Sequence, residues 1–269
     1  MTGSAIFRQG KIAYRMAGEG RCVVLLHGFL ESSAIWDTYL HLLCKQYRVI
    51  AIDLPGHGSS DSFGYVHDME MMALAVKAVL DKLGLRKYVM IGHSMGGYVA
   101  LAFAELFPDH LRGLSLFHST ASADSADKRA DRDKAIEAVK KNAEVYVRAA
   151  IPRLFHAPGI AQFAKEIVDL NLIASSCDRR AIIACLEGMK QRKNREMLLE
   201  FAPYPVLFLM GLHDPILPLH HVEYQFALPE NAMVCILKQS AHMGFIEEKK
   251  TTLKYLRVFI RRCHAPSDE

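Results

Sequence analysis

The sequence predicts an α/β protein in which a mostly parallel β-sheet, flanked by helices, is interrupted once by a helical insertion. Three observations predict this class. Short, continuously apolar runs alternate with amphipathic stretches over roughly the first 120 residues. Residues 121–203 then carry helical patterns without a convincing buried strand, and the alternation resumes from residue 204. Continuous apolar runs are typical of strands covered on both faces, and their alternation with helices is typical of a parallel sheet.

The first part of the chain begins with two short strands joined by a turn at Gln9-Gly10, and buried strands follow. The expected strands are 5–8, 11–16, 22–26, 49–52, 88–91 and 114–117. Amphipathic stretches between them predict helices over 33–47, 66–83 and 98–107. Pro108 closes the last of these helices because proline cannot continue a helix.

The remaining chain divides into the insertion and a return to the sheet. Within the insertion we expect helices over 124–142, 143–154, 161–173, 179–192 and 196–201. After it we expect a strand over 205–210, a helix over 220–226, a strand over 233–238 and a closing helix over 247–262. The predicted organisation is therefore a core of residues 1–120 and 204–269, with residues 121–203 inserted into it.

The composition narrows the class of protein and of partner. Of the 269 residues, 51% are hydrophobic, and the formal net charge of +4 is weak evidence for a polyanionic partner. No apolar run is long enough for a transmembrane helix, and the first residues lack an apolar leader segment. The six cysteines form no C-x-x-C pair. We therefore expect reduced thiols, a cytoplasmic location, no zinc or other metal, and no nucleic-acid or membrane partner.

A serine motif lies where an expected strand meets an expected helix. Gly92-His93-Ser94-Met95-Gly96 matches G-x-S-x-G. Such a turn strains the serine backbone and exposes its hydroxyl, and the flanking glycines avoid collisions in the tight bend. The helix that follows directs its positive dipole end toward developing negative charge. Ser94 is thus a candidate nucleophile, and the alternative is a glycine-rich packing turn that happens to contain a serine.

A serine nucleophile needs a base, and the base needs an orienting acid. In strand–turn–helix serine sites the acid and then the histidine follow the serine along the chain, on loops after later strands. Asp214 and His242 occupy such loops. Asp214 could instead be a turn residue and His242 a surface histidine. His93 should point away from the site. The competing histidines in or beside the acid's loop are His213, His220 and His221.

Two backbone amides are candidates for the oxyanion hole. One belongs to Met95, directly after the nucleophile, and the other to Phe29 in the loop after the expected strand 22–26. Removing such a donor typically costs about 3 kcal/mol of transition-state stabilisation. His27 and the loop 53–60 are interpreted as structural.

Together these motifs resemble the α/β-hydrolase superfamily. The segments that carry the resemblance are 25–29, 53–58, 92–97, 211–214 and 241–242. The resemblance implies an eight-stranded, mostly parallel sheet with a helical cap after the sixth strand. Ser94 excludes the branches with an aspartate nucleophile. Cofactor-free haloperoxidases usually carry tryptophan where this chain has Phe29, which looks more like carboxylesterases, menaquinone-pathway lyases and carbon–carbon bond hydrolases.

The main hypothesis is a carboxylesterase-like serine hydrolase that cleaves small or medium acyl esters without a cofactor. Its partner would be a small-molecule ester. A lyase or carbon–carbon hydrolase on the same triad is the first alternative, and a ligand-binding receptor on this fold is the second. The lyase branch needs basic cap residues that hold carboxylates. Four candidates exist, and we interpret them as exposed helix positions: Arg148, Arg153, Lys165 and Arg179. The oligomeric state cannot be deduced from the sequence.

Overall fold

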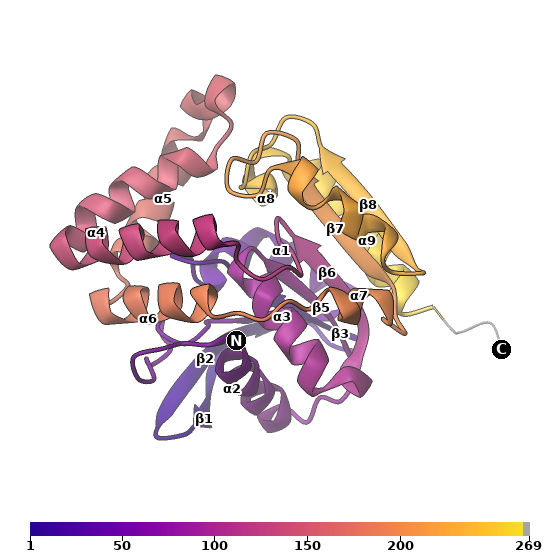
Figure 1. Cartoon of the computed structure of the whole chain (residues 1–269). Helices are drawn as coiled ribbons and strands as arrows, with labels where there is room; N and C mark the ends of the chain where they lie inside the picture. Colours follow the sequence, from indigo (N-terminus) through magenta and orange to yellow (C-terminus); the bar gives the residue numbers. More distant parts are fainter. Residues whose placement is uncertain (266–269) are drawn as a thin grey trace.

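A single eight-stranded sheet forms the centre of the molecule, as the computed structural model of residues 1–265 describes it (Figure 1). The spatial order is β1-β2-β4-β3-β5-β6-β7-β8. Strands β1 and β2 form an antiparallel hairpin, β2 pairs antiparallel with β4, and every other pair is parallel. The bounds are β1 Thr2–Phe7, β2 Gly10–Ala17, β3 Cys22–Leu26, β4 Arg48–Ile52, β5 Tyr88–His93, β6 Leu111–Phe117, β7 Val206–Gly211 and β8 Ala232–Leu237. The predicted fold class is therefore confirmed.

Helices flank this sheet and bury its apolar strands. They are α1 Asp37–Leu43, α2 Met69–Lys82, α3 Met95–Leu106, α8 Gly244–Glu247 and α9 Lys249–Cys263. Helix α2 begins where the Asp68 side chain accepts from the Met71 amide, as an N-cap residue does. Helix α9 packs on β6, where a Cβ at Gly113 would collide with Cys263. The parallel strands β3 and β5 are completely buried.

The segment between β6 and β7 is helical, and Figure 1 shows α4, α5 and α6 gathered on one side of the molecule. Its helices are α4 Ala126–Ala150, α5 Ala164–Ser175, α6 Arg179–Lys190 and α7 Glu196–Glu200. Helix α4 is broken at Asn142, whose φ of −161° and ψ of 102° are not helical. The Asn142 side chain accepts from the Val145 amide and so caps the second half of α4. This break corresponds to the expected boundary between two helices.

The prediction of one helix over residues 220–226 is wrong. The chain there forms two 3₁₀ turns, Leu219–His221 and Glu223–Ala227. Gln225 is buried and donates to the hydroxyls of Thr120 and Ser122, a tertiary role that local periodicity does not reveal. The expected closing helix is also interrupted, at Glu248, whose carboxylate accepts from the Gln239 amide and the Ser240 hydroxyl.

Two expectations from composition can be compared with the structure. No helix within residues 1–265 is long and apolar enough to cross a bilayer. All six cysteines are free. Burial raises the pKa of Cys22 and of Cys263 to about 12, so these thiols are unreactive at neutral pH.

Candidate active site

Ser94 occupies the sharp turn between β5 and α3. Its backbone has φ 48° and ψ −115°, a conformation that non-glycine residues rarely adopt. A Cβ at Gly92 would lie 2.3 Å from the carbonyl oxygen of Gly96, and one at Gly96 would lie 2.5 Å from that of Leu26. Only glycines fit on both sides of the turn. The surrounding backbone therefore holds a strained serine at the carboxyl end of the central strand.

The structure brings Ser94, His242 and Asp214 into one hydrogen-bonded chain. His242 Nε2 lies 2.9 Å from Ser94 Oγ, and His242 Nδ1 lies 2.7 Å from Asp214 Oδ2. Asp214 Oδ1 accepts from the amides of Ile216 (2.9 Å) and Leu217 (3.0 Å). Burial would raise the pKa of Asp214, but the facing histidines outweigh it and hold that pKa well below its usual range. The ionised carboxylate fixes the His242 tautomer whose Nε2 can accept the serine proton.

Neighbouring groups fix the loop that carries His242. The His242 amide donates to the carbonyl of Leu154 at 2.8 Å. One Glu247 oxygen accepts from the Ala241 amide at 2.9 Å and the Met243 amide at 3.2 Å. The other accepts from the His156 amide at 2.7 Å. Leu154 and His156 belong to the helical insertion, so the insertion and the histidine loop are directly connected.

His118 is a site residue that the sequence analysis missed. It follows β6, and its Nδ1 lies 3.1 Å from Asp214 Oδ2. The Gly244 amide lies 3.2 Å from its Nε2 and the Gly211 amide 3.2 Å from its Nδ1, and the ionised Asp214 carboxylate favours the tautomer with the proton on Nδ1. Burial lowers the pKa of His118 to about 4. Its position at the carboxyl end of a strand was the available signal, because every site loop leaves this sheet edge.

His93 and Glu31 form a buried pair beside the nucleophile. As predicted, the His93 side chain does not bond Ser94. Its Nδ1 lies 3.0 Å from Glu31 Oε2, and its Nε2 donates to the His242 carbonyl at 3.0 Å. Burial lowers the pKa of His93, but Glu31 outweighs this effect and the pKa is raised overall. Glu31 also accepts from the Gly28 amide. The pair thus connects the loop after β3 to the backbone of the catalytic-base candidate.

The two predicted oxyanion amides are available as donors. Among residues 1–265, neither the Phe29 nor the Met95 amide donates to a hydrogen bond. The amides on either side of Phe29 are occupied, that of Gly28 by Glu31 and that of Leu30 by His57 at 3.3 Å. His27 Nε2 accepts from the Leu54 amide (2.9 Å), consistent with its structural interpretation. The Phe29 amide is thus a free donor between two occupied amides, as an oxyanion donor must be.

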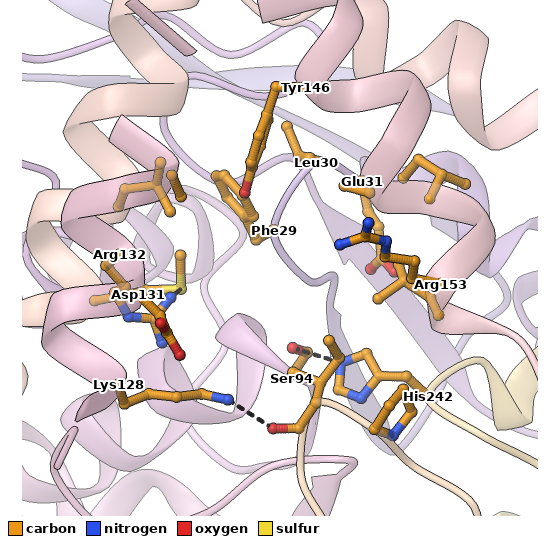
Figure 2. A pocket seen from close by; sticks show the side chains of 18 of the residues that line it. Phe29, Leu30, Glu31, Ser94, Lys128, Asp131, Arg132, Tyr146, Arg153 and His242 are labelled. Atoms are coloured by element: carbon orange, nitrogen blue, oxygen red, sulfur yellow. Dashed lines mark hydrogen bonds between the residues drawn. The ribbon is translucent and has the colours of Figure 1, made fainter. Parts of the chain in front are cut away.

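A cavity of about 480 Å³ opens above Ser94 and His242, between the core loops and the insertion (Figure 2). Its walls are mostly apolar and include Phe29, Tyr146 and Leu154. Basic side chains also face it: Lys128, Arg132 and Arg153. This volume lies in the range of sites for small molecules.

The competing sequence candidates lie elsewhere. His213, His220 and His221 are exposed and do not contact Ser94. Of the four basic cap candidates only Arg153 lines the cavity; it is exposed, as interpreted, but it lies in a 3₁₀ turn at the cavity wall. His118, Asp214 and His242 could in principle surround an ion. Their facing ring nitrogens are instead hydrogen-bond donors to one carboxylate, which suits proton transfer rather than metal ligation.

Acid should destabilise the fold through histidines that are buried in neutral form. Burial lowers the pKa of His57 to about 3 and the pKa of His67 and His118 to about 4. In the unfolded chain each of these histidines takes up a proton below about pH 6.5. Each therefore lowers the free energy of unfolding by up to about 2 kcal/mol at pH 5. His93, whose pKa is raised, offsets part of this loss. Thermal melts should give a lower Tm at about pH 5 than at about pH 7.5, with a smaller difference in His57→Gln. A Tm that is equal or higher in acid would contradict this account.

The fold and site define a class, the hydrolase-type α/β proteins with a serine on the turn after β5. Residues 21–249 match the family model described as the alpha/beta hydrolase fold. The match covers most of the chain, and the protein belongs to this family.

Individual relatives agree on the family and differ in activity. The chain is 29% identical over 254 residues to the dihydrolipoyllysine-residue acetyltransferase component of the acetoin cleaving system of Pseudomonas putida, covering 93% of this chain but only 66% of that protein. A malate-bound thermophilic esterase from Thermogutta terrifontis superposes with a TM-score of 0.92 at 28% identity, covering 98% and 100% of the two chains. A stretch of 88 residues is 46% identical to the non-heme haloperoxidase of Rhodococcus erythropolis, covering 32% of each.

Proposed function

We propose that the protein is a serine hydrolase that cleaves carboxylic esters with small to medium acyl groups. The observation that carries this proposal is the chain Ser94 Oγ–His242–Asp214 at the floor of a cavity of about 480 Å³. Similarity to an esterase that covers both chains almost completely supports it.

The proposed reaction has two halves. His242 Nε2 takes the Ser94 proton as Oγ attacks the ester carbonyl, and the amides of Phe29 and Met95 stabilise the oxyanion. The proton then passes from His242 to the leaving alcohol, which departs and leaves an acyl-enzyme. Water activated by His242 cleaves the acyl-enzyme, releases the acid and restores Ser94. Asp214 stays ionised throughout and stabilises the transient imidazolium.

Residues 121–203 act in this proposal as a cap that roofs the site, and the remaining described residues act as the hydrolase core. Apolar insertion residues in the cavity wall, such as Ile151 and Leu154, support this division. The substrate is a small-molecule ester and the reaction needs no cofactor.

A panel of p-nitrophenyl esters from acetate to dodecanoate tests the proposal. We expect kcat/KM to reach at least about 10⁴ M⁻¹ s⁻¹ for the preferred chain and to fall for the longest chains. A folded protein that reacts with a fluorophosphonate probe but turns over no ester would favour the lyase or carbon–carbon hydrolase. Absence of both reactions would favour a receptor.

A second candidate is favoured by the haloperoxidase match. Hydrogen peroxide, in place of water, could attack the acyl-enzyme and release a peracid and free Ser94. Peracid formation in the presence of peroxide, measured with a halogenation dye against the rate of ester hydrolysis, separates the two candidates. Hydrolysis that greatly exceeds peracid release supports the esterase.

A further inference from the structure

Three cationic side chains face the cavity from two sides of the insertion. Lys128 and Arg132 belong to α4, and Arg153 belongs to the 3₁₀ turn Ile151–Leu154 that follows it. Figure 2 shows Lys128 and Arg132 on one side of the cavity and Arg153 on the other, with Ser94 and His242 between the two sides. Ser94 therefore lies between two side walls of the cavity that both carry positive charge.

The charge of Arg132 is only partly compensated. Its guanidinium bonds the carboxylate of Asp124, which is completely buried. The same carboxylate is bonded by Arg192, which also stacks over the Tyr98 ring, 4.1 Å from its centroid. Burial would raise the pKa of Asp124, but the two arginines outweigh it and lower that pKa. Two guanidinium groups thus share one negative charge, and one positive charge remains at the cavity wall.

The other two cations have no carboxylate partner in the described chain. The Lys128 ammonium donates to the Ile216 carbonyl at 2.9 Å, a bond that leaves its charge uncompensated. The exposed side chain of Arg153 makes no hydrogen bond or ion pair within residues 1–265. Its planar fork of donors is suited to a carboxylate.

The acidic groups of the cavity do not cancel this excess. Glu31 is paired with His93. Asp131 is exposed and lies 3.0 Å from the ammonium of Lys134. Outside the cavity, Arg148 is paired with Glu144 at 2.7 Å and Lys165 with Asp169 at 2.6 Å, whereas other basic residues of the insertion, such as Lys141 and Arg179, form no ion pair within residues 1–265. What distinguishes Lys128 and Arg153 is therefore their position at the cavity wall, next to Ser94 and His242.

We infer that the cavity takes esters that also carry a free carboxylate, held by Arg153 and Lys128, with Arg132 adding to the field. This inference rests on the proposed esterase function and names its substrate class. The apolar wall of Phe29, Tyr146 and Leu154 would cover the carbon chain between the two ends.

Matched substrates test the inference directly. The rate of hydrolysis, measured by proton release, is compared between monoethyl half-esters from malonate to adipate and their diethyl esters. The rate for each diethyl ester is halved, because it carries two cleavable groups. Acetate esters of hydroxycarboxylic acids and their amides test a carboxylate on the alcohol side. In at least one series we expect kcat/KM to favour the free carboxylate about tenfold or more, and added salt should reduce this preference. Equal or better hydrolysis of the masked esters in both series would overturn the inference.

Variants locate the anion site through the carboxylate preference, which is the ratio of kcat/KM for the ester with a free carboxylate to kcat/KM for its masked counterpart. Arg153→Met and Lys128→Met should each lower the preference roughly three- to tenfold, and Arg153→Lys should restore part of it. Asp131→Asn should raise the carboxylate preference, because it removes a negative charge from the cavity wall. Arg148→Met removes the same charge outside the cavity and should leave the ratio unchanged. If Arg148→Met lost as much of the carboxylate preference as Arg153→Met, the effect would belong to the surface charge in general, and the assignment would be overturned.

Binding separates this inference from the proposed function. Calorimetry on Ser94→Ala measures glutarate and its neutral diamide without turnover. Tighter binding of glutarate that weakens in Arg153→Met supports the anion site even if no ester is hydrolysed. Ester hydrolysis without such binding would overturn the inference and leave the esterase intact.

Discussion

Replacing Ser94 with alanine should reduce kcat for the best ester about 10⁴- to 10⁶-fold and abolish reaction with a fluorophosphonate probe. The expected loss is large because the acyl-enzyme cannot form without Oγ, and only binding and the oxyanion amides remain to accelerate hydrolysis by water. The fold should survive, because alanine can be placed on the same turn and, within residues 1–265, Ser94 Oγ bonds only His242. Intact mass gives the labelling stoichiometry, and His242→Ala should label much more slowly.

Ser59→Ala is the matched control, because Ser59 is an exposed serine in the loop interpreted as structural. It should label and turn over like the unchanged protein. One probe per chain that persists in Ser94→Ala would place the nucleophile at another residue and refute the assignment.

Replacing Asp214 with asparagine should reduce kcat about 10³- to 10⁴-fold with little change in KM. Asparagine Oδ1 can still accept from the Ile216 and Leu217 amides, which directs its NH₂ group toward the Nδ1 atoms of His242 and His118. His242 must then accept at Nδ1 and carry its proton on Nε2, where it can no longer take the proton of Ser94. The defect is in the tautomer and not in the fold.

Steady-state kinetics together with a thermal melt distinguish these two causes. Asp109→Asn makes the same chemical change at an exposed position of the 3₁₀ turn Pro108–His110 and should be neutral. A loss of less than about tenfold in Asp214→Asn would mean that another group orients His242.

The sheet and its loop chemistry could be predicted because both depend on short-range signals. Continuous apolar runs mark the buried parallel strands, and parallel strands bring their carboxyl ends to one edge. Residues after β5, β7 and β8 therefore had to meet, and the structure brings Ser94, Asp214 and His242 together. Their catalytic role stays a prediction that the two variants above test.

Other features depend on tertiary contacts that local patterns do not carry. The sequence does not reveal that His118 shares the Asp214 carboxylate, because no pattern marks a histidine after a buried strand as a hydrogen-bond partner. Nor does it separate Arg153 from Arg148. The break at Asn142 and the turn Ile151–Leu154 change the direction of the chain, so helical periodicity cannot assign their faces.

The hydrogen bond from the His242 amide to the Leu154 carbonyl couples the position of the insertion, the proposed roof, to that of His242, the proposed general base. If the insertion lifts at Leu154, it either draws the imidazole away from Ser94 or leaves a buried amide unpaired, at a cost of about 1–3 kcal/mol. By thermodynamic reciprocity, a substrate that favours the lowered roof also favours the aligned imidazole. In the proposed mechanism an open site therefore either has a misaligned base or bears the cost of the unpaired amide, and the bound substrate would favour the aligned base.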